Sequence, residues 1–146
     1  MKEIYERLGL ASDDDVTHHI VLDHEQRDKG RLKTETTEGE QVRIFLERGK
    51  PLLVGEKLKT LCGAVVQVEG AEEEVAYGEC VNWQDFAKAC YHLGNRHVKL
   101  QVGDRWLQFK PDHVLEEMVQ GLGVTIEHRQ SVFIPESGAY SHGHHH

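Results

Sequence analysis

Apolar and polar side chains alternate with a period of two through much of the first half of the chain, which is the spacing of half-buried strands. The clearest run is residues 42–46, with the sequence VRIFL. A Glu38-Gly39 turn separates it from residues 31–36 and predicts a hairpin. No helical period of useful length precedes residue 71. Three further short strands are predicted, at residues 19–23, 57–62 and 64–69.

The pattern changes to a helical period twice in the second half. Asn82 is a good N-cap residue, with Asp85 three positions on, and Gly94 is expected at the C′ position that ends this helix. A second helix is expected to begin after Asp112 and to end at Gly121 and Gly123. The predicted apolar faces are Phe86, Ala89, Cys90 and Leu93 in the first helix, and Val114, Leu115, Met118, Val119 and Leu122 in the second.

Extended runs surround these helices, so the second half has the order β-α-β-β-α-β of a ferredoxin-like domain. The acidic run at residues 72–74 separates the halves and is interpreted as a solvated connector. The predicted class is therefore α+β, with an all-β domain at residues 1–73 and a ferredoxin-like domain at residues 74–146. The runs in question are residues 75–81, 98–102, 105–109 and 125–134.

Composition and charge narrow the function. The net charge of −8 disfavours nucleic acid and anionic membrane surfaces as partners. No segment approaches the roughly 18 apolar residues of a membrane span, and the N-terminus has no apolar signal core. Three cysteines without a CxxC pair argue against a disulfide framework and fit partly buried thiols in the cytoplasm.

The absence of the common catalytic motifs favours a protein that is not an enzyme. The chain contains no GxxxxGK[ST] phosphate-binding loop, and no HExxH, HxE or GxSxG sequence. His24-Glu25 is followed by Gln-Arg-Asp and makes no zincin pair. A metallohydrolase is the least favoured reading.

Histidine is the unusual component, with eleven residues in the chain. If Val98, Leu100 and Val102 face the helices, His97 lies on the opposite, open face of the sheet. Two interpretations stay open for it, a solvated turn residue or a metal ligand, because an isolated histidine is weak evidence for a metal. His113 likewise fits either a polar residue in the first turn of a helix or a ligand, since a helix N-terminus disfavours the imidazolium form.

The chain ends in SHGHHH, which is either a native metal-binding tail or a purification tag. The interruption at Gly143 favours a native tail, whose histidines are His142, His144, His145 and His146. Imidazole ligands suit Ni(II), Zn(II), Cu(II) and Co(II). Affinity order alone favours copper, so any nickel specificity must come from metal supply and partners.

The run AKACYHLGNRHVKLQV at residues 87–102 resembles the UreE-type urease accessory proteins, which are nickel metallochaperones. The likeness continues at DHVLEEM, residues 112–118, and at PESGAYSHGHHH, residues 135–146. KGRLKTETTEGEQVRIFLERGKPLLVGEKL in the first half is similar to the family's N-terminal domain. The resemblance covers nearly the whole chain.

The resemblance implies an N-terminal domain like the peptide-binding domain of Hsp40-type chaperones, and a C-terminal domain that dimerises and binds nickel. It implies that His97 lies at the two-fold axis of a homodimer, with the tail histidines as further ligands. Pairs of dimers are a further option. The implied partners are the accessory GTPase and apo-urease.

One departure from the family pattern weakens the case for a second metal site, at His113. Some relatives carry another histidine two positions before the residue that matches His113, and this chain has Pro111 there. A competing interpretation is a chaperone-like module of the urease maturation complex in which metal binding is incidental.

Overall fold

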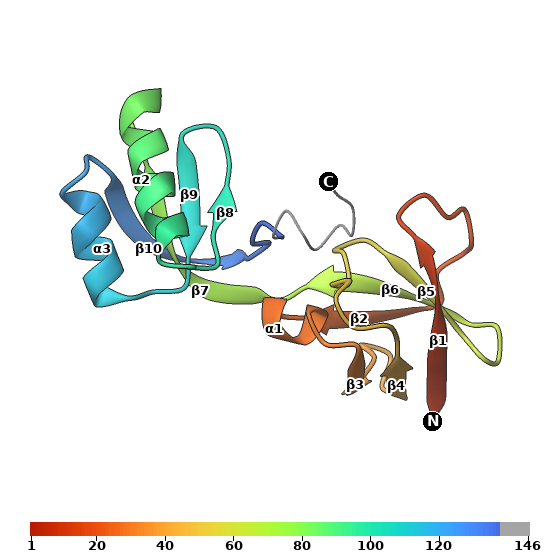
Figure 1. Cartoon of the computed structure of the whole chain (residues 1–146). Coiled ribbons are helices and arrows are strands. Elements are labelled where there is room, and N and C mark those ends of the chain that lie inside the picture. Colours follow the sequence, from red (N-terminus) through yellow and green to blue (C-terminus); the bar gives the residue numbers. More distant parts are fainter. Residues whose placement is uncertain (138–146) are drawn as a thin grey trace. The chain divides into compact units, whose positions relative to one another are not determined.

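The computed structural model describes residues 1–137, which form two compact units, Met1–Ala71 and Glu72–Ser137. Each unit has its own hydrophobic core. Both units are built on β-sheet, and helices contribute mainly to the second (Figure 1). No helix within the described residues has the length and apolarity needed to cross a membrane.

The first unit is a six-stranded sheet with the order β2-β6-β5-β1-β4-β3. Neighbouring strands are antiparallel except for the pairs β1–β4 and β2–β6, which are parallel. The only helix within Met1–Ala71 is the single turn α1, His24–Arg27. The strands are β1 (Lys2–Gly9), β2 (His18–Leu22), β3 (Arg31–Glu35), β4 (Gln41–Phe45), β5 (Lys57–Thr60) and β6 (Val65–Gly70).

The predicted hairpin at Glu38-Gly39 is confirmed. The Thr36 amide donates to the Glu40 carbonyl at 2.8 Å, and the Gly39 amide donates to the Thr36 carbonyl at 2.9 Å. Gly39 has a φ of 90°, which a glycine adopts without steric cost. Alternation along β4 also behaves as predicted, because Val42 and Ile44 are buried while Arg43 is exposed.

A buried ion pair fixes the segment between β4 and β5. Glu56 is 2% exposed, and its carboxylate accepts hydrogen bonds from Arg7 Nε and Nη2, both at 2.6 Å. The guanidinium of Arg7 also donates to the carbonyls of Lys50 and Pro51 at 2.8 and 2.9 Å. The Leu53 amide donates to Glu56 Oε1 at 3.0 Å. These bonds connect the segment to strand β1.

The second unit has a four-stranded antiparallel sheet with the order β10-β7-β9-β8. Numbered within the unit, this is the order 4-1-3-2 of a ferredoxin-like fold, so the predicted class is confirmed. Both helices contribute to one core with alternate residues of β7 and β9, which places them on the same face (Figure 1). The elements are β7 (Glu72–Glu79), α2 (Trp83–Asn95), β8 (Gln101–Val102), β9 (Trp106–Phe109), α3 (His113–Gln120) and β10 (Thr125–Val132).

Some details of the second unit differ from the sequence prediction. Glu72, Glu73 and Glu74 are not a connector, since they begin β7 and pair with Val132, Ser131 and Gln130 of β10. Their side chains are tolerated in a strand because the start of β7 carries little of the core.

Strand β8 is also shorter than predicted and spans two residues. Val102 is 38% exposed, and Val114, assigned to the apolar face of α3, is 61% exposed. Both lie at the margin of the core, where local alternation no longer decides burial.

Candidate metal centre

Helix α2 positions the most informative histidine. Asn82 caps the helix, and its side chain accepts a hydrogen bond from the Asp85 amide at 2.8 Å. Phe86, Ala89 and Leu93 are buried against the sheet, as the helical spacing predicts. This packing fixes the axis of the helix and therefore the position of its C-terminal end.

The end of α2 differs from the prediction in an instructive way. Gly94 lies inside the helix, which continues to Asn95, and His97 occupies the left-handed C′ position with a φ of 58°. The His97 amide donates to the Gly94 carbonyl at 3.0 Å, and the Val98 amide donates to the Leu93 carbonyl at 3.3 Å. These two bonds define a Schellman motif. Histidine is one of the few residues other than glycine that are enriched in this conformation.

His97 is consequently a helix-end residue rather than a strand residue, and the prediction that it lies on an open sheet face is wrong. Its side chain is exposed. Within residues 1–137, no group forms a hydrogen bond or ion pair with the His97 imidazole. The backbone holds the residue firmly while its ring stays available.

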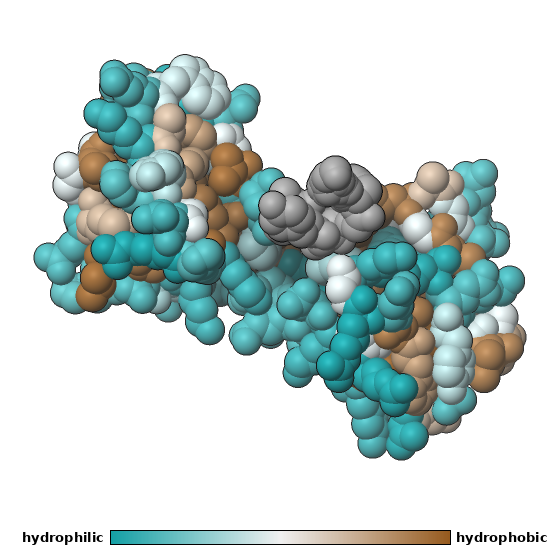
Figure 2. Space-filling model, viewed as in Figure 1, coloured by the Kyte–Doolittle hydropathy of each residue, from teal (hydrophilic) through white to brown (hydrophobic). Residues whose placement is uncertain are grey.

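A row of exposed aromatic and small residues runs along the outer side of α2 toward its C-terminal end, where His97 lies. Trp83 and Tyr91 are 57% and 68% exposed, and Ala87 lies between them at the same four-residue spacing. Gly94 continues the row, and apart from its own stretch of helix no heavy atom of residues 1–137 lies within 4 Å of the place where its Cβ would be. We call Trp83, Ala87, Tyr91 and Gly94 the α2 outer row. On the side of the molecule seen in Figure 2, apolar residues are interspersed with the hydrophilic ones on both units.

His113 is the first residue of α3, after the N-cap Asp112. Its Nε2 atom lies 3.2 Å from the Oε2 atom of Glu117, one turn along the helix, and its side chain is 88% exposed. The structure therefore gives His113 a carboxylate partner in the folded chain. Within the described residues, no three or more His, Cys, Asp and Glu side chains form a group that could hold a metal ion. The tail candidates His142, His144, His145 and His146 lie outside the described residues.

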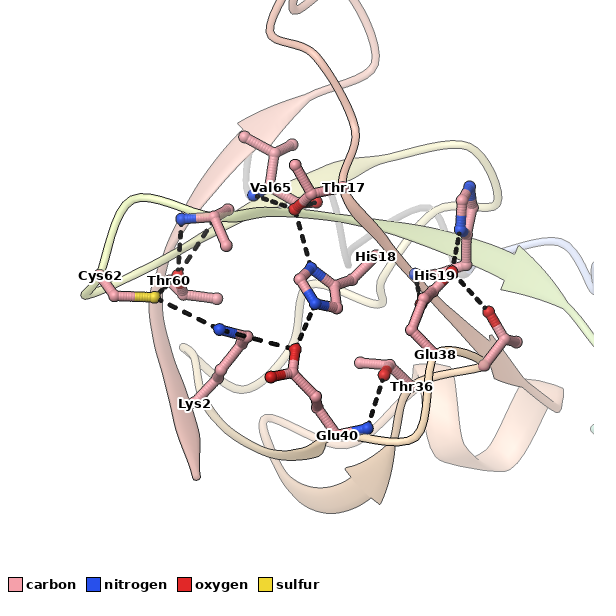
Figure 3. A network of polar contacts seen from close by, with 12 residues as sticks. Lys2, Thr17, His18, His19, Thr36, Glu38, Glu40, Thr60, Cys62 and Val65 are labelled. Atoms are coloured by element: carbon pink, nitrogen blue, oxygen red, sulfur yellow. Dashed lines mark hydrogen bonds and ion pairs between the residues drawn. The ribbon is translucent and has the colours of Figure 1, made fainter.

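Other histidines form carboxylate pairs that sequence reasoning missed. His128 Nε2 lies 2.6 Å from Glu116 Oε1, and this hydrogen bond raises the pKa of His128. In the first unit, His18 pairs with Glu40, and His19 Nδ1 lies 2.9 Å from Glu38 Oε2 (Figure 3). Each pair joins residues far apart in the sequence, so no local spacing signals it.

The polar network of Figure 3 also perturbs two ionisable groups. The hydrogen bond from His19 lowers the pKa of Glu38 to about 2. Cys62 Sγ lies 3.2 Å from Thr60 Oγ1 and 3.6 Å from Lys2 Nζ, and these contacts lower its pKa to about 7. Burial instead raises the pKa of Cys80 and of Cys90. The three thiols are free, and the pKa of Cys62 is shifted in the opposite direction from those of Cys80 and Cys90.

Comparison with known proteins shows the class of protein to which this chain belongs. Residues 2–71 match the N-terminal domain of the UreE urease accessory protein, and residues 73–146 match its C-terminal domain. The chain therefore belongs to the UreE family of urease accessory proteins, as the resemblance of the sequence predicted.

Individual relatives support the same assignment over the full length. The urease accessory protein UreE of Marinomonas sp. (strain MWYL1) is 61% identical over 146 residues, which cover 100% of this chain and 99% of the relative. The UreE of Psychromonas ingrahamii is 47% identical over 149 residues, covering 100% of this chain and 97% of the relative. The UreE of Alteromonas mediterranea is 54% identical over 128 residues, covering 87% and 83%.

Proposed function

We propose that this chain is a nickel metallochaperone that carries Ni(II) between the His97 rings of a homodimer and delivers it for assembly of the urease active site. The observation that supports this most directly is the exposed imidazole of His97, a residue whose backbone is held by a Schellman motif and whose ring has no partner within residues 1–137. A two-fold axis near this position would bring two such rings to one ion.

The α2 outer row supports the dimer. Glycine inside a helix costs about 1 kcal/mol relative to alanine. Gly94 has no positive φ, and no neighbour among residues 1–137 requires a glycine there. Close approach of a second chain explains it, and the exposed Trp83 and Tyr91 supply apolar area on the same side.

Two imidazoles leave coordination positions open, and the tail histidines His142, His144, His145 and His146 are proposed to fill them. His113 is proposed as a weaker site. Zn(II), Cu(II) and Co(II) also suit imidazole ligands, and affinity order alone favours copper, so nickel selectivity would arise from supply and from the partners. Those partners are proposed to be the accessory GTPase and apo-urease, and the free thiols agree with work in the cytoplasm.

Calorimetric titration of nickel into the full chain tests the assignment. His97→Ala should abolish the tightest site while sedimentation still shows a dimer. His97→Gly is the sharper variant, because glycine suits the left-handed position and should stabilise the helix end by roughly 0.5–1 kcal/mol while removing the ligand. His113→Ala should leave the tight site in place. Unchanged tight binding in both His97 variants would refute the proposal.

The pH dependence of nickel affinity and truncation of the C-terminal tail provide two independent tests. Imidazoles bind metal in the neutral form, so nickel affinity should fall as the pH drops through about 6.5. A chain ending at Tyr140 should keep the His97 site but bind fewer nickel ions per dimer. Combined measurement of bound nickel and oligomer mass distinguishes dimers from pairs of dimers.

The competing proposal, a chaperone-like module with incidental metal binding, rests on the separate core of the first unit and on its exposed Tyr5. A full-length chain lacking all the proposed ligands discriminates between the two. If it still supports urease activation as well as the unaltered chain does at limiting nickel, the carrier proposal fails.

A further inference from the structure

One face of the first unit combines basic and aromatic side chains on three neighbouring strands, β3, β4 and β1. Ile4, Val42 and Ile44 point into the core, so the alternate residues of β1 and β4 point outward. Strand pairing places Arg31 opposite Phe45 and Lys33 opposite Arg43. The same outward face continues onto β1, the strand that pairs with β4 on its other side (Figure 1).

The aromatic part of this face is flat and accessible. The rings of Tyr5 and Phe45 are stacked, with centroids 5.0 Å apart and an interplanar angle of 11°. The guanidinium carbon of Arg31 lies 5.7 Å from the centroid of the Phe45 ring. Tyr5 is 52% exposed. Arg31, Phe45 and Tyr5 thus form one continuous row across the three strands.

This face carries exposed positive charges, although the chain as a whole is negatively charged. Arg31, Lys33 and Arg43 are exposed, and no carboxylate of residues 1–137 forms an ion pair with any of them. Two acidic residues lie nearby, Glu3 opposite Arg43 and Glu35 at the end of β3. Three cations against these two carboxylates leave the face with a small positive excess, in a chain whose net charge is −8. We call Arg31, Lys33, Arg43, Tyr5 and Phe45 the basic aromatic face.

We propose that the basic aromatic face is a docking surface for an acidic, extended segment of a partner protein that carries at least one large apolar side chain. Guanidinium groups bind carboxylates through paired hydrogen bonds, and the stacked rings offer apolar area beside them. Arginine and aromatic residues are also the side chains most enriched at protein interfaces.

The geometry of the sheet favours an extended partner. Residues two apart on one strand lie on the same face, roughly 6.6 Å apart, which is also the repeat of same-side residues in an extended peptide. Strand β3 is the last strand in the order of the sheet, so within the described residues no further strand pairs with its outer edge, where a partner backbone could add. A segment lying along β3 would meet Arg31 and Lys33 with alternate side chains.

A polyphosphate partner fits less well. Nucleic acid binding depends on a broad basic surface that displaces counterions, whereas Glu3 and Glu35 interrupt this face and the whole chain is acidic. The proposal is separate from the nickel site and uses none of the candidate ligands.

Fluorescence anisotropy with the full chain tests the proposal without metal. The probe is a short fluorescein-labelled peptide of Glu-Glu-Phe repeats, compared with the same peptide carrying glutamine or lysine in place of glutamate. Arg43→Glu is the test variant. Lys88→Glu, an exposed reversal on α2, is the matched control with the same change in net charge. Arg31→Glu and Tyr5→Ala test the charge and the ring separately.

The acidic peptide should bind best, and its affinity should weaken as salt rises from about 50 to about 300 mM. Arg43→Glu and Arg31→Glu should each reduce affinity about 10-fold, whereas Lys88→Glu should leave it unchanged. Nickel titration should be unaltered in Arg43→Glu, which separates this test from that of the carrier. Equal binding of the glutamine peptide, stronger binding of oligothymidylate, or equal loss in Lys88→Glu would overturn the proposal.

Discussion

The Nε2 atom of His128 lies 2.6 Å from the Oε1 atom of Glu116, and this contact joins strand β10 to helix α3 on the surface of the second unit. The hydrogen bond to Glu116 raises the pKa of His128 above its usual value near 6.5, and the charge of Glu74 adds to the effect. Folding therefore favours the protonated ring.

The contact predicts a pH-dependent stability. A raised pKa in the folded state means that the stabilisation is fully present below the unfolded pKa of about 6.5 and is lost as the pH rises through the folded pKa. His128→Gln should lower the melting temperature most near pH 6, and the difference should shrink above neutral pH. Differential scanning calorimetry across this range measures it, with the exposed Gln130→Ala on the same strand as control. A constant difference at every pH would contradict the prediction.

Gly94→Ala should have opposite effects on the stability of helix α2 and on dimerisation. Alanine should favour helix α2 by up to about 1 kcal/mol, because Gly94 is helical and the space around its Cβ position is empty. The same methyl group should hinder close approach of a second chain, so the dissociation constant of the proposed homodimer should rise. Chemical denaturation and sedimentation equilibrium measure the two effects. The exposed helix residue Gln120 on α3 supplies a control, since Gln120→Ala should leave dimerisation unchanged.

Removal of the buried carboxylate of Glu56 should destabilise the first unit strongly. Glu56→Ala leaves the guanidinium of Arg7 without its carboxylate partner, at a cost of about 2–4 kcal/mol. Glu47→Ala is the comparison, because Glu47 forms an exposed pair with Lys50 at 3.3 Å and should change stability by less than about 1 kcal/mol. Urea denaturation measures both. Similar losses in the two variants would show that burial of the pair is unimportant.

Cys62 should be the fastest of the three thiols to react with iodoacetamide near neutral pH. Contacts with Thr60 and Lys2 lower its pKa to about 7, whereas burial raises the pKa of Cys80 and of Cys90. Peptide mass spectrometry over time gives the three rates. Lys2→Gln should shift the pH midpoint of Cys62 labelling upward, and Lys59→Gln should not, because Lys2 is the lysine that contacts the sulfur.

Local patterning was sufficient to predict most elements of the fold. Residues Asn82 and Asp112 mark both helix starts because capping is a short-range hydrogen bond. Strand β1 was missed because KEIYERLG has weak alternation, and its identity as a strand depends on pairing with β4 and β5. Helix α1 was missed because a single turn leaves no period to detect.

The sequence was enough to predict which residues are candidates for the site, but not their backbone conformation or their partners. Gly94 was the natural choice for C′, yet the left-handed position lies three residues later at His97, because the buried Leu93 and the partly buried Val98 pack on one core and select where the chain turns. The pairs His128–Glu116 and His18–Glu40 could not be predicted, since each depends on tertiary packing between distant elements. The basic aromatic face emerged only when strand register placed Arg31, Phe45 and Tyr5 side by side.

The interior of the second unit is complete without His97 or His113. Phe86, Ala89 and Leu93 fill it together with residues from the sheet, and both histidines stay outside. Small zinc domains, in contrast, unfold when they lose their ion. The carrier proposed above would therefore be emptied and refilled while its architecture stays intact. Handover of cargo would then be governed by exchange of ligands at an outer surface, with no refolding step to delay it.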